Sequence, residues 1–325
     1  MSYAKAKKLD VEKVPVIDIT SLRNGRNANE VAKKLHQAST GLGFIYIKGH
    51  GIANETIASL RRDGMKFFRS NDEQKQTVRV SQKHRGWLDY GGAKMKENAK
   101  VDLKESFIWG YQDAAGCTVD DHPLRGRNQW PSFQPSLQYS AMGYFKSGDE
   151  LARTLLKGFA LGLSLPENFF IRTSSQPLSR ASLVYYPSQP KEFGADQFGV
   201  SAHTDFGVLT ILCQDNVGGL QIQDRNGDWF HAPPIPNTLI INVADLLARW
   251  TGGEYKSTPH RVVNESGKER MSIVLAFDPN PETLIDAKEV FGQEFAAPDD
   301  PITCGDYLIW RFNKAFAYRK NNDNR

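Results

Sequence analysis

Three side chains in the second half of the sequence have the types and the order of a metal site. His203 and Asp205 flank a single threonine, and His260 follows much later in the chain. Two imidazoles and one carboxylate can hold a ferrous ion on one face and leave coordination positions open for oxygen and a small chelating acid. Zinc accepts the same ligands, but nothing in the sequence resembles the helical H-E-x-x-H arrangement of zinc proteases. The pattern therefore favours iron.

The short His-x-Asp motif gains meaning only from its neighbours. With seven His and 22 Asp in 325 residues, chance alone yields roughly half an occurrence of it. Here, however, the motif leads directly into the apolar, β-branched segment 206–212, which predicts a strand. Residues i and i+2 of an extended segment share a face, so His203 and Asp205 can bind one ion from one strand or its end.

The third ligand, His260, must reach the same ion from a different strand. Segment 257–263 is expected to be extended, because Pro259 disfavours a helical conformation of the residue before it. We expect the strands of His203 and His260 to lie on facing sheets of a barrel, which would bring His260 within bonding range.

An arginine and a serine downstream form a candidate anion site. Arg270 and Ser272 open the apolar segment 273–277 and share one face of the predicted strand, with Met271 on the other. A buried guanidinium is costly unless an anion pairs with it, and a carboxylate offers two parallel hydrogen bonds. A lone arginine would more often pair with one of the 37 acidic residues. Beside three candidate iron ligands, an anionic cosubstrate is the favoured partner.

A series of motifs resembles the iron(II)- and 2-oxoglutarate-dependent dioxygenase family, in its isopenicillin N synthase-like branch. The resemblance extends over roughly residues 14–280, with the motifs in the order of the family. Besides the motifs of His203, His260 and Arg270, its landmarks are the segments 14–19, 43–52, 85–87, 102–107, 130–131, 185–187, 218–221 and 241–245.

This resemblance implies a role for each candidate residue. The residues that would bind Fe(II) are His203, Asp205 and His260. Those that would bind the cosubstrate 2-oxoglutarate are Arg270, Ser272 and Tyr186. Val184 replaces an asparagine that is common in the plant members, so one cosubstrate contact is missing. The implied reaction consumes O2 and 2-oxoglutarate, releases succinate and CO2, and hydroxylates, desaturates or cyclises a small molecule.

Other functions fit the same residues. An isopenicillin N synthase-like oxidase would use iron and O2 without 2-oxoglutarate, and Arg270 and Ser272 would then hold a carboxylate of the substrate. Ethylene formation from 2-oxoglutarate itself is another outcome within the family. A non-catalytic jelly-roll module that binds a small acid or a protein is an alternative of a different class, although such a module has no need of iron ligands.

The elements that must position these residues are helices in the first half and short strands in the second. Apolar residues at helical spacing predict helices over residues 27–42, 53–68 and 148–163. Asn226-Gly227 suits the turn of a hairpin between 220–222 and 229–230. We expect a mainly β fold with flanking helices (α+β), in which a double-stranded β-helix or jelly-roll core follows an N-terminal helical and mixed region.

Three segments are expected within one compact unit. Residues 1–175 would form an N-terminal dioxygenase region of helices and first strands, and residues 176–285 the jelly-roll core that holds iron and 2-oxoglutarate. Residues 286–325 would form a C-terminal extension packed on that core. Its aromatic stretch Trp310-Arg311-Phe312 would close over the mouth of the barrel.

Composition narrows the classes of partner. The chain is 40% hydrophobic and 24% charged, which is typical of globular proteins, and no apolar run approaches the roughly 18 residues of a membrane-spanning helix. Its three widely spaced cysteines suit a reducing compartment, so we expect a soluble, cytoplasmic protein without a membrane partner. Dispersed Lys and Arg residues do not indicate nucleic-acid binding. The net charge of +4 slightly favours an anionic small-molecule substrate.

Contacts to the substrate are the least defined part of the site. The candidates are cationic or aromatic residues in the landmark segments or on the strands beside the iron ligands: Arg85, Trp87, Lys104, Phe206 and Phe277. Each of these residue types is more often used for packing than for recognition, and functional loops vary freely in sequence.

Overall fold

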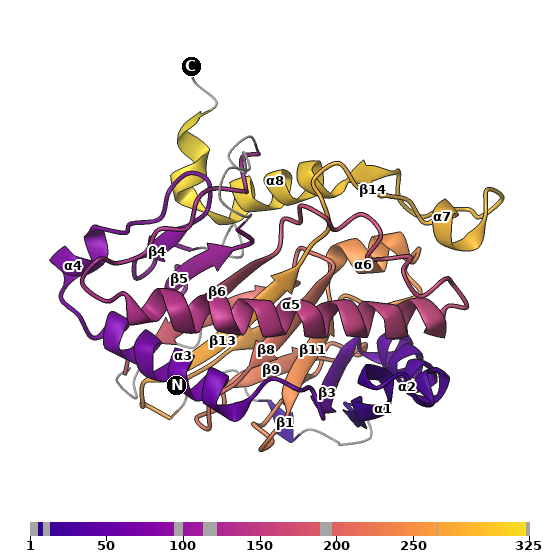
Figure 1. The fold of residues 1–325 in the computed structure, drawn as a ribbon, viewed down its shortest axis with the longest axis horizontal. Coiled ribbons are helices and arrows are strands. Elements are labelled where there is room, and N and C mark those ends of the chain that lie inside the picture. The colour runs from indigo at the N-terminus through magenta and orange to yellow at the C-terminus, as the bar shows by residue number, and fades with distance from the viewer. Residues whose placement is uncertain are drawn as a thin grey trace.

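Two facing β-sheets form the centre of the protein, and helices cover the outer side of the larger sheet (Figure 1). The computed structural model describes residues 6–8, 14–93, 100–112, 122–188, 197–264 and 266–322. The two-sheet core with flanking helices confirms the predicted jelly roll. The expected segment boundaries near residues 175 and 285 stay predictions.

The larger sheet contains strands from both halves of the chain. Its order is β2 (Val16–Asp18), β3 (Phe44–Lys48), β11 (Leu239–Val243), β8 (Leu209–Cys213), β13 (Arg270–Phe277), β6 (Arg180–Tyr186), β5 (Glu105–Gly110) and β4 (Gly86–Leu88). The pairing of β3 with β11 and of β5 with β6 joins N-terminal strands to the core sheet.

The smaller sheet faces the inner side of the larger one. Its order is β1 (Lys7–Lys8), β10 (Trp229–His231), β9 (Leu220–Gln223), β12 (His260–Val262) and β7 (Val200–His203). Strands β9 and β10 pair antiparallel around Gly227, whose φ of 84° belongs to a tight turn, so the predicted hairpin is confirmed. A short ladder of β14 (Leu284–Ile285) and β15 (Ile302–Thr303) lies apart from both sheets.

The helices precede, connect and follow the strands. They are α1 (Thr20–Arg23), α2 (Ala28–Gly41), α3 (Asn54–Phe68), α4 (Asp72–Gln76), α5 (Ser136–Gly162), α6 (Asp245–Trp250), α7 (Lys288–Phe291) and α8 (Cys304–Ala315), with a final 3-10 turn over Ala317–Asn322. Two of the predicted helices match α2 and α3 to within a residue at each end. The third, α5, begins at Ser136 and not at Gly148 as expected.

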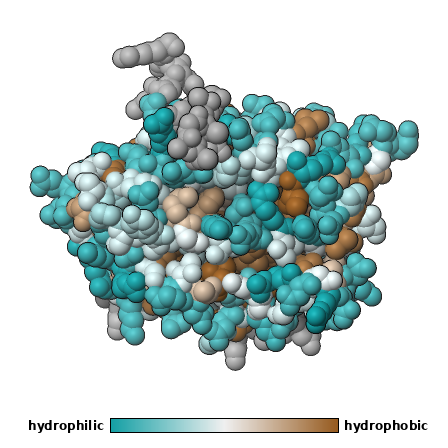
Figure 2. All heavy atoms as spheres, viewed as in Figure 1, coloured by the Kyte–Doolittle hydropathy of each residue, from teal (hydrophilic) through white to brown (hydrophobic). Residues whose placement is uncertain are grey.

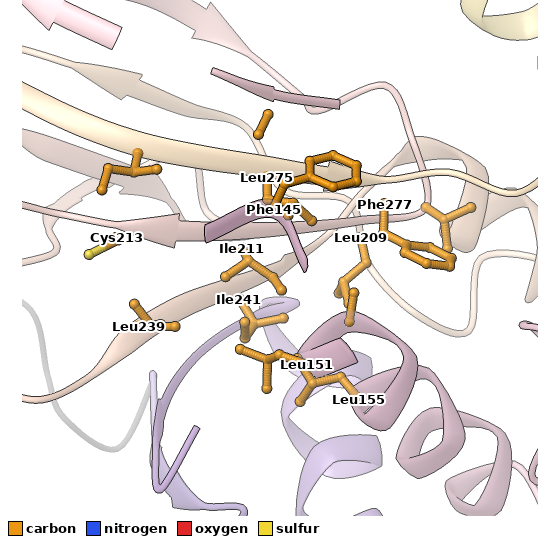
Figure 3. Packing of buried hydrophobic residues seen from close by; sticks show 14 of the residues in the cluster. Phe145, Leu151, Leu155, Leu209, Ile211, Cys213, Leu239, Ile241, Leu275 and Phe277 are labelled. Atoms are coloured by element: carbon orange, nitrogen blue, oxygen red, sulfur yellow. The ribbon is translucent and has the colours of Figure 1, made fainter. Parts of the chain in front are cut away.

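Alternate side chains along the strands of the larger sheet point to opposite faces, one toward the helices and the other toward the space between the sheets. On β8, Leu209 and Ile211 belong to the cluster beneath the helices, whereas the residue between them, Thr210, faces the space between the sheets. Figure 3 shows Leu151 and Leu155 of α5 on the helical side of this sheet. The outer face is thus closed by α5, which leaves the inner face to line a site.

Replacing the fully buried Leu155 with alanine is expected to lower the free energy of unfolding by about 2 to 5 kcal/mol, because the deletion leaves a cavity between α5 and the sheet. Chemical denaturation measures the change. Tyr139→Ala, on an exposed position of the same helix, is the control and should change stability by less than about 0.5 kcal/mol. A loss as small as that for Leu155→Ala would show that α5 is not packed as described.

The surface of the protein is mixed in polarity, and the described cysteines are buried. Among the described residues, no helix combines the length and the apolar character needed to cross a bilayer. On the face that α5 covers, apolar residues form small islands between hydrophilic ones (Figure 2). Cys213 and Cys304 are buried free thiols, and Cys117 lies outside the described residues.

Candidate metal and cosubstrate site

The strand pairing brings the three predicted metal ligands together. His203 is the last residue of β7, His260 is the first of β12, and the two face each other in antiparallel register. Asp205 follows two residues beyond the end of β7. The expectation that the two histidines lie on facing sheets is wrong: they are cross-strand neighbours in the smaller sheet, where side chains on one face are already close enough to share an ion.

The ligand atoms lie at the spacing of a mononuclear site. Oδ1 of Asp205 is 3.6 Å from Nε2 of His203 and 3.7 Å from Nε2 of His260. Ligand atoms of all three residues lie within 4.8 Å of one another. Donors each about 2.1 Å from one ion must lie roughly 3 to 4 Å apart, so this donor set fits a single metal ion.

Hydrogen bonds orient each of the three side chains. Nδ1 of His203 donates to the Ser201 carbonyl at 2.8 Å, and Nδ1 of His260 donates to the Thr258 carbonyl at 3.2 Å. Because a carbonyl only accepts, these contacts leave both Nε2 lone pairs free for a metal. The amide of Asn242 donates to Oδ2 of Asp205 at 2.8 Å, which directs Oδ1 toward the histidines.

The protonation states also suit a metal site. Burial raises the pKa of the Asp205 carboxyl, but His260, His203 and the Asn242 hydrogen bond together hold it well below its usual value. Burial, and then the neighbouring His203, lower the pKa of His260 to about 4, although Asp205 opposes this. Asp205 is therefore ionised and His260 neutral at pH 7, as metal coordination requires.

A cavity of about 170 Å³ lies between the sheets and contains both candidate sites. Arg270 lines it with only 1% of its surface exposed, and its Nε and Nη1 atoms have no hydrogen-bond partner among the described residues. Oγ of Ser272 is likewise buried and unpaired. Tyr186, which pairs with Arg270 across β6 and β13, places its ring 4.5 Å from the guanidinium carbon.

This arrangement argues for an anion from outside the chain. Within the described residues, no carboxylate forms an ion pair with Arg270, so the internal salt bridge that a lone arginine would favour is not formed there. An unpaired buried guanidinium is costly. A carboxylate bound to Arg270 and Ser272 would satisfy the orphaned donors and balance the charge.

The structure divides the five candidate substrate residues by the face on which they lie. Lys104 and Phe206 line the cavity. Phe277 is an odd number of residues from Arg270 on β13, so it points to the helical core and away from the cavity. Trp87 also points to the helical core and away from the cavity, and its indole donates to Glu105 at 2.7 Å. These two side chains do not contact a molecule bound between the sheets.

Arg85, the residue that precedes β4, does not line the cavity either, because its side chain is enclosed by other parts of the protein. It is fully buried, and its Nη1 donates to the His84 carbonyl at 3.0 Å. Burial, with the nearby Arg180 charge, lowers its pKa to about 9. The aromatic stretch expected at the mouth is split: Phe312 on α8 lines the cavity, whereas Trp310 is 48% exposed.

Sequence reasoning gave no role to Asp245, which connects the metal ligands to α8. Its backbone N–H donates to the Asp205 carbonyl at 2.9 Å. Its carboxylate accepts from Thr204, Ser257 and Tyr307, at 3.2, 2.7 and 3.0 Å. A polar pair at the end of an apolar strand, Asn242 and Asp245, is the sequence signal that could have identified both supporting residues.

Sequence profiles of known families match both halves of the chain. The 2OG-Fe(II) oxygenase superfamily matches residues 179–279, and the N-terminal region of the non-haem dioxygenases in morphine synthesis matches residues 14–133. A protein of Dictyostelium discoideum described as a probable iron/ascorbate oxidoreductase is 33% identical, over 98% of this chain and 99% of its own length. A 1-aminocyclopropane-1-carboxylate oxidase of the same organism is 30% identical, over 97% of this chain and 99% of its own.

Solved structures agree with these relatives. A full-length protein of Neurospora crassa, in complex with α-KG and thymine, superposes with a TM-score of 0.82 at 27% identity. The superposition covers 93% of this chain and 98% of that one. The same two-sheet fold is therefore found around a bound 2-oxo acid and a small-molecule ligand in that protein.

Proposed function

Because the chain belongs to the iron(II)- and 2-oxoglutarate-dependent oxygenase superfamily, we propose that His203, Asp205 and His260 hold the iron and that Arg270, Ser272 and Tyr186 hold 2-oxoglutarate. The protein is an oxidoreductase that uses Fe(II), 2-oxoglutarate and O2. Solved relatives in complex with α-KG favour this function over the oxidase without 2-oxoglutarate, and the three metal ligands favour it over the non-catalytic module. The reaction oxidises a C–H bond of a small molecule by hydroxylation, desaturation or cyclisation.

The observation that carries this assignment is the unpaired Arg270 in the same cavity as the three metal ligands. When bound, iron and 2-oxoglutarate supply oxygen activation, coupled to release of succinate and CO2. The chain contributes two neutral imidazoles and one carboxylate, which partly neutralise the ion, and a guanidinium that offsets the second carboxylate of the cosubstrate. The apolar walls between the sheets exclude water from the reacting groups.

Anaerobic spectroscopy tests the assignment. Addition of Fe(II) and then 2-oxoglutarate should produce a weak visible metal-to-ligand charge-transfer band. The band should disappear in His203→Ala and weaken in Arg270→Ala. Iron binding without any band would show that 2-oxoglutarate does not chelate the iron and would favour the oxidase that uses no 2-oxoglutarate. Failure to bind iron would contradict the ligand assignment.

Loss of the Asn242 amide should weaken metal binding without removing a ligand. Asn242→Ala deletes the hydrogen bond that orients Asp205, and such supporting contacts typically change metal affinity by about 10- to 100-fold. Competition with a metal-sensitive chelator measures the change. Asn280→Ala removes a buried amide outside the cavity and should leave the metal affinity unchanged.

We further propose that the substrate is a small anionic molecule and that the protein acts in the cytoplasm. The net charge of +4 supports the first of these proposals. The sparse, widely spaced cysteines support the second. Thymine and 5-formyluracil in complexes of the Neurospora protein are ligands of that protein, and they support only the general class of small molecule here.

A further inference from the structure

Lys104 places a buried positive charge in the cavity, and its ammonium group has no acid partner in the part of the chain that the structure describes. It lies just before β5, and its side chain lines the cavity together with Ser106 and Ile108, which share its face of the extended segment. Lys104 is only 8% exposed, and within the described residues its ammonium group forms no hydrogen bond or ion pair. Asp102 and Asp205 act on it only at longer range.

Two other cations of the protein interior, by contrast, have acids beside them. Lys75, which is 5% exposed, contacts Glu105 at 2.9 Å and Asp72 at 3.1 Å. Arg180, another cation of the cavity lining, forms an ion pair of 2.5 Å with Asp278. Arg85 and Arg270 are also buried without an acid partner among the described residues, but of these three cations only Lys104 and Arg270 line the cavity.

Among the described charged groups that line the cavity, Lys104 is the one left without a direct counter-charge in the proposed complex. In the proposed complex, iron(II), Asp205, Arg270 and the two carboxylates of 2-oxoglutarate sum to zero. The ion pair between Arg180 and Asp278 is also neutral. Asp102 is buried behind the cavity lining. Its Oδ1 accepts the Ser201 N–H at 2.9 Å, its Oδ2 has no hydrogen-bond partner among the described residues, and it acts on Lys104 only at longer range. Within the described residues the ammonium group thus lacks a direct counter-ion, and one monoanion would supply it.

Aromatic side chains form part of the lining of the same cavity. Phe206 and Phe312 meet edge to face with ring centroids 5.7 Å apart, and Phe316 stacks on Phe312 at 5.3 Å. All three line the cavity, as do the aliphatic Leu88 and Ile108. Such a surface favours a flat or apolar body over a highly hydroxylated one.

We propose that Lys104, assisted by the hydroxyl of Ser106, binds the acidic group of the substrate, and that the substrate is a small monocarboxylic acid with an aromatic or apolar body. The body lies against Phe206, Phe312 and Phe316. This inference rests on the proposed function, because it assigns Arg270 to 2-oxoglutarate and leaves Lys104 for the substrate.

Two fluorine-labelled probes that differ only in charge test this proposal. 4-Fluorophenylacetate and 4-fluorophenylacetamide are titrated, by 19F NMR, into the full chain loaded with Zn(II) and saturating 2-oxoglutarate, which occupies Arg270. The wild type should bind the acid at least about tenfold more tightly than the amide, as a charge-assisted contact provides. Lys104→Met should remove this preference, and Lys104→Arg should retain part of it. Replacing Zn(II) by paramagnetic Mn(II) should broaden the signal of the bound acid if it lies near the metal.

Lys314→Met is the matched control, because it removes one positive charge from an exposed position of α8. It should keep the preference for the acid. Lys104→Met should unfold at the same temperature as the wild type or higher, since the ammonium group has no ion-pair partner among the described residues to lose. Equal binding of the two probes, no binding of the acid, an unbroadened signal with Mn(II), or a preference retained in Lys104→Met would overturn the proposal. Failure of the proposed function is recognised separately, because the protein would then not bind the metal or 2-oxoglutarate before any probe is added.

Discussion

His260→Ala is expected to abolish iron(II) binding and all turnover of 2-oxoglutarate. The substitution removes one of two neutral nitrogen donors, and Asp205 and His203 alone cannot hold the ion on one face. Loss of a contact that merely orients a ligand already weakens metal binding by up to about 100-fold, so loss of the ligand itself should exceed that factor. Calorimetric titration with Fe(II) under anaerobic conditions measures the affinity, and succinate formation measures turnover.

His231→Ala provides a matched control for this experiment. His231 lies on β10 of the same sheet, away from the cavity lining, so its loss should leave the iron affinity unchanged. The fold should survive the change at His260, because among the described residues the imidazole makes a single hydrogen bond, through Nδ1, to the Thr258 carbonyl. A folded His260→Ala protein that bound iron with undiminished affinity would contradict the ligand assignment.

Local sequence signals were sufficient for most of the fold. The apolar stripe of α2 and the Asn-Gly turn between β9 and β10 both lie within a few residues of the structure they specify. The start of α5 was missed because two glycines, Gly143 and Gly148, interrupt a stripe that continues back to Leu137. Helix α8 was missed too, although Thr303 accepts a hydrogen bond from the Asp306 N–H in a typical N-terminal cap.

Strand order was not available from local patterns. The residues around His203 and His260 predict extended segments, but the antiparallel pairing of β7 with β12 depends on contacts far apart in sequence. Facing sheets and neighbouring strands can both bring two histidines together. The two arrangements differ in what holds the histidines together. Neighbouring strands are held by the hydrogen bonds of one sheet, so His203 and His260 stay close whatever the distance between the two sheets.

The two-residue period of a strand also predicts which of the candidate substrate residues face the cavity. Once Arg270 points into the cavity, the two-residue period of β13 sends Phe277 to the helical side. The same period selects Lys104 over Glu105 on the segment that leads into β5. The period does not predict that Lys104 and Arg270 lack acid partners among the described residues, because this depends on every element that surrounds the cavity.

Arg270→Met should raise the KM for 2-oxoglutarate by at least about 30-fold while leaving the apoprotein as stable as before or more so. Truncating one partner of a buried charge pair costs about 2 to 5 kcal/mol, which sets the expected loss of affinity. In the apoprotein the opposite holds, because a guanidinium with two unpaired nitrogens is replaced by a side chain that suits its apolar surroundings. A residue that only supported the fold would show destabilisation instead.

Thermal unfolding with and without 2-oxoglutarate separates these two roles. At a cosubstrate concentration of 100 times Kd, the metal-loaded wild type should gain about 2.7 kcal/mol, whereas a variant with a 30-fold weaker site should gain below about 1 kcal/mol. Arg172→Met removes an exposed arginine paired with Glu289 and should retain the full gain. If Arg270→Met destabilised the apoprotein and kept the gain from 2-oxoglutarate, the arginine would serve the fold, and the cosubstrate carboxylate would have to bind another cation of the cavity. Lys104 would then be the nearest candidate that has no acid partner among the described residues, and its assignment to the substrate would fall with that of Arg270.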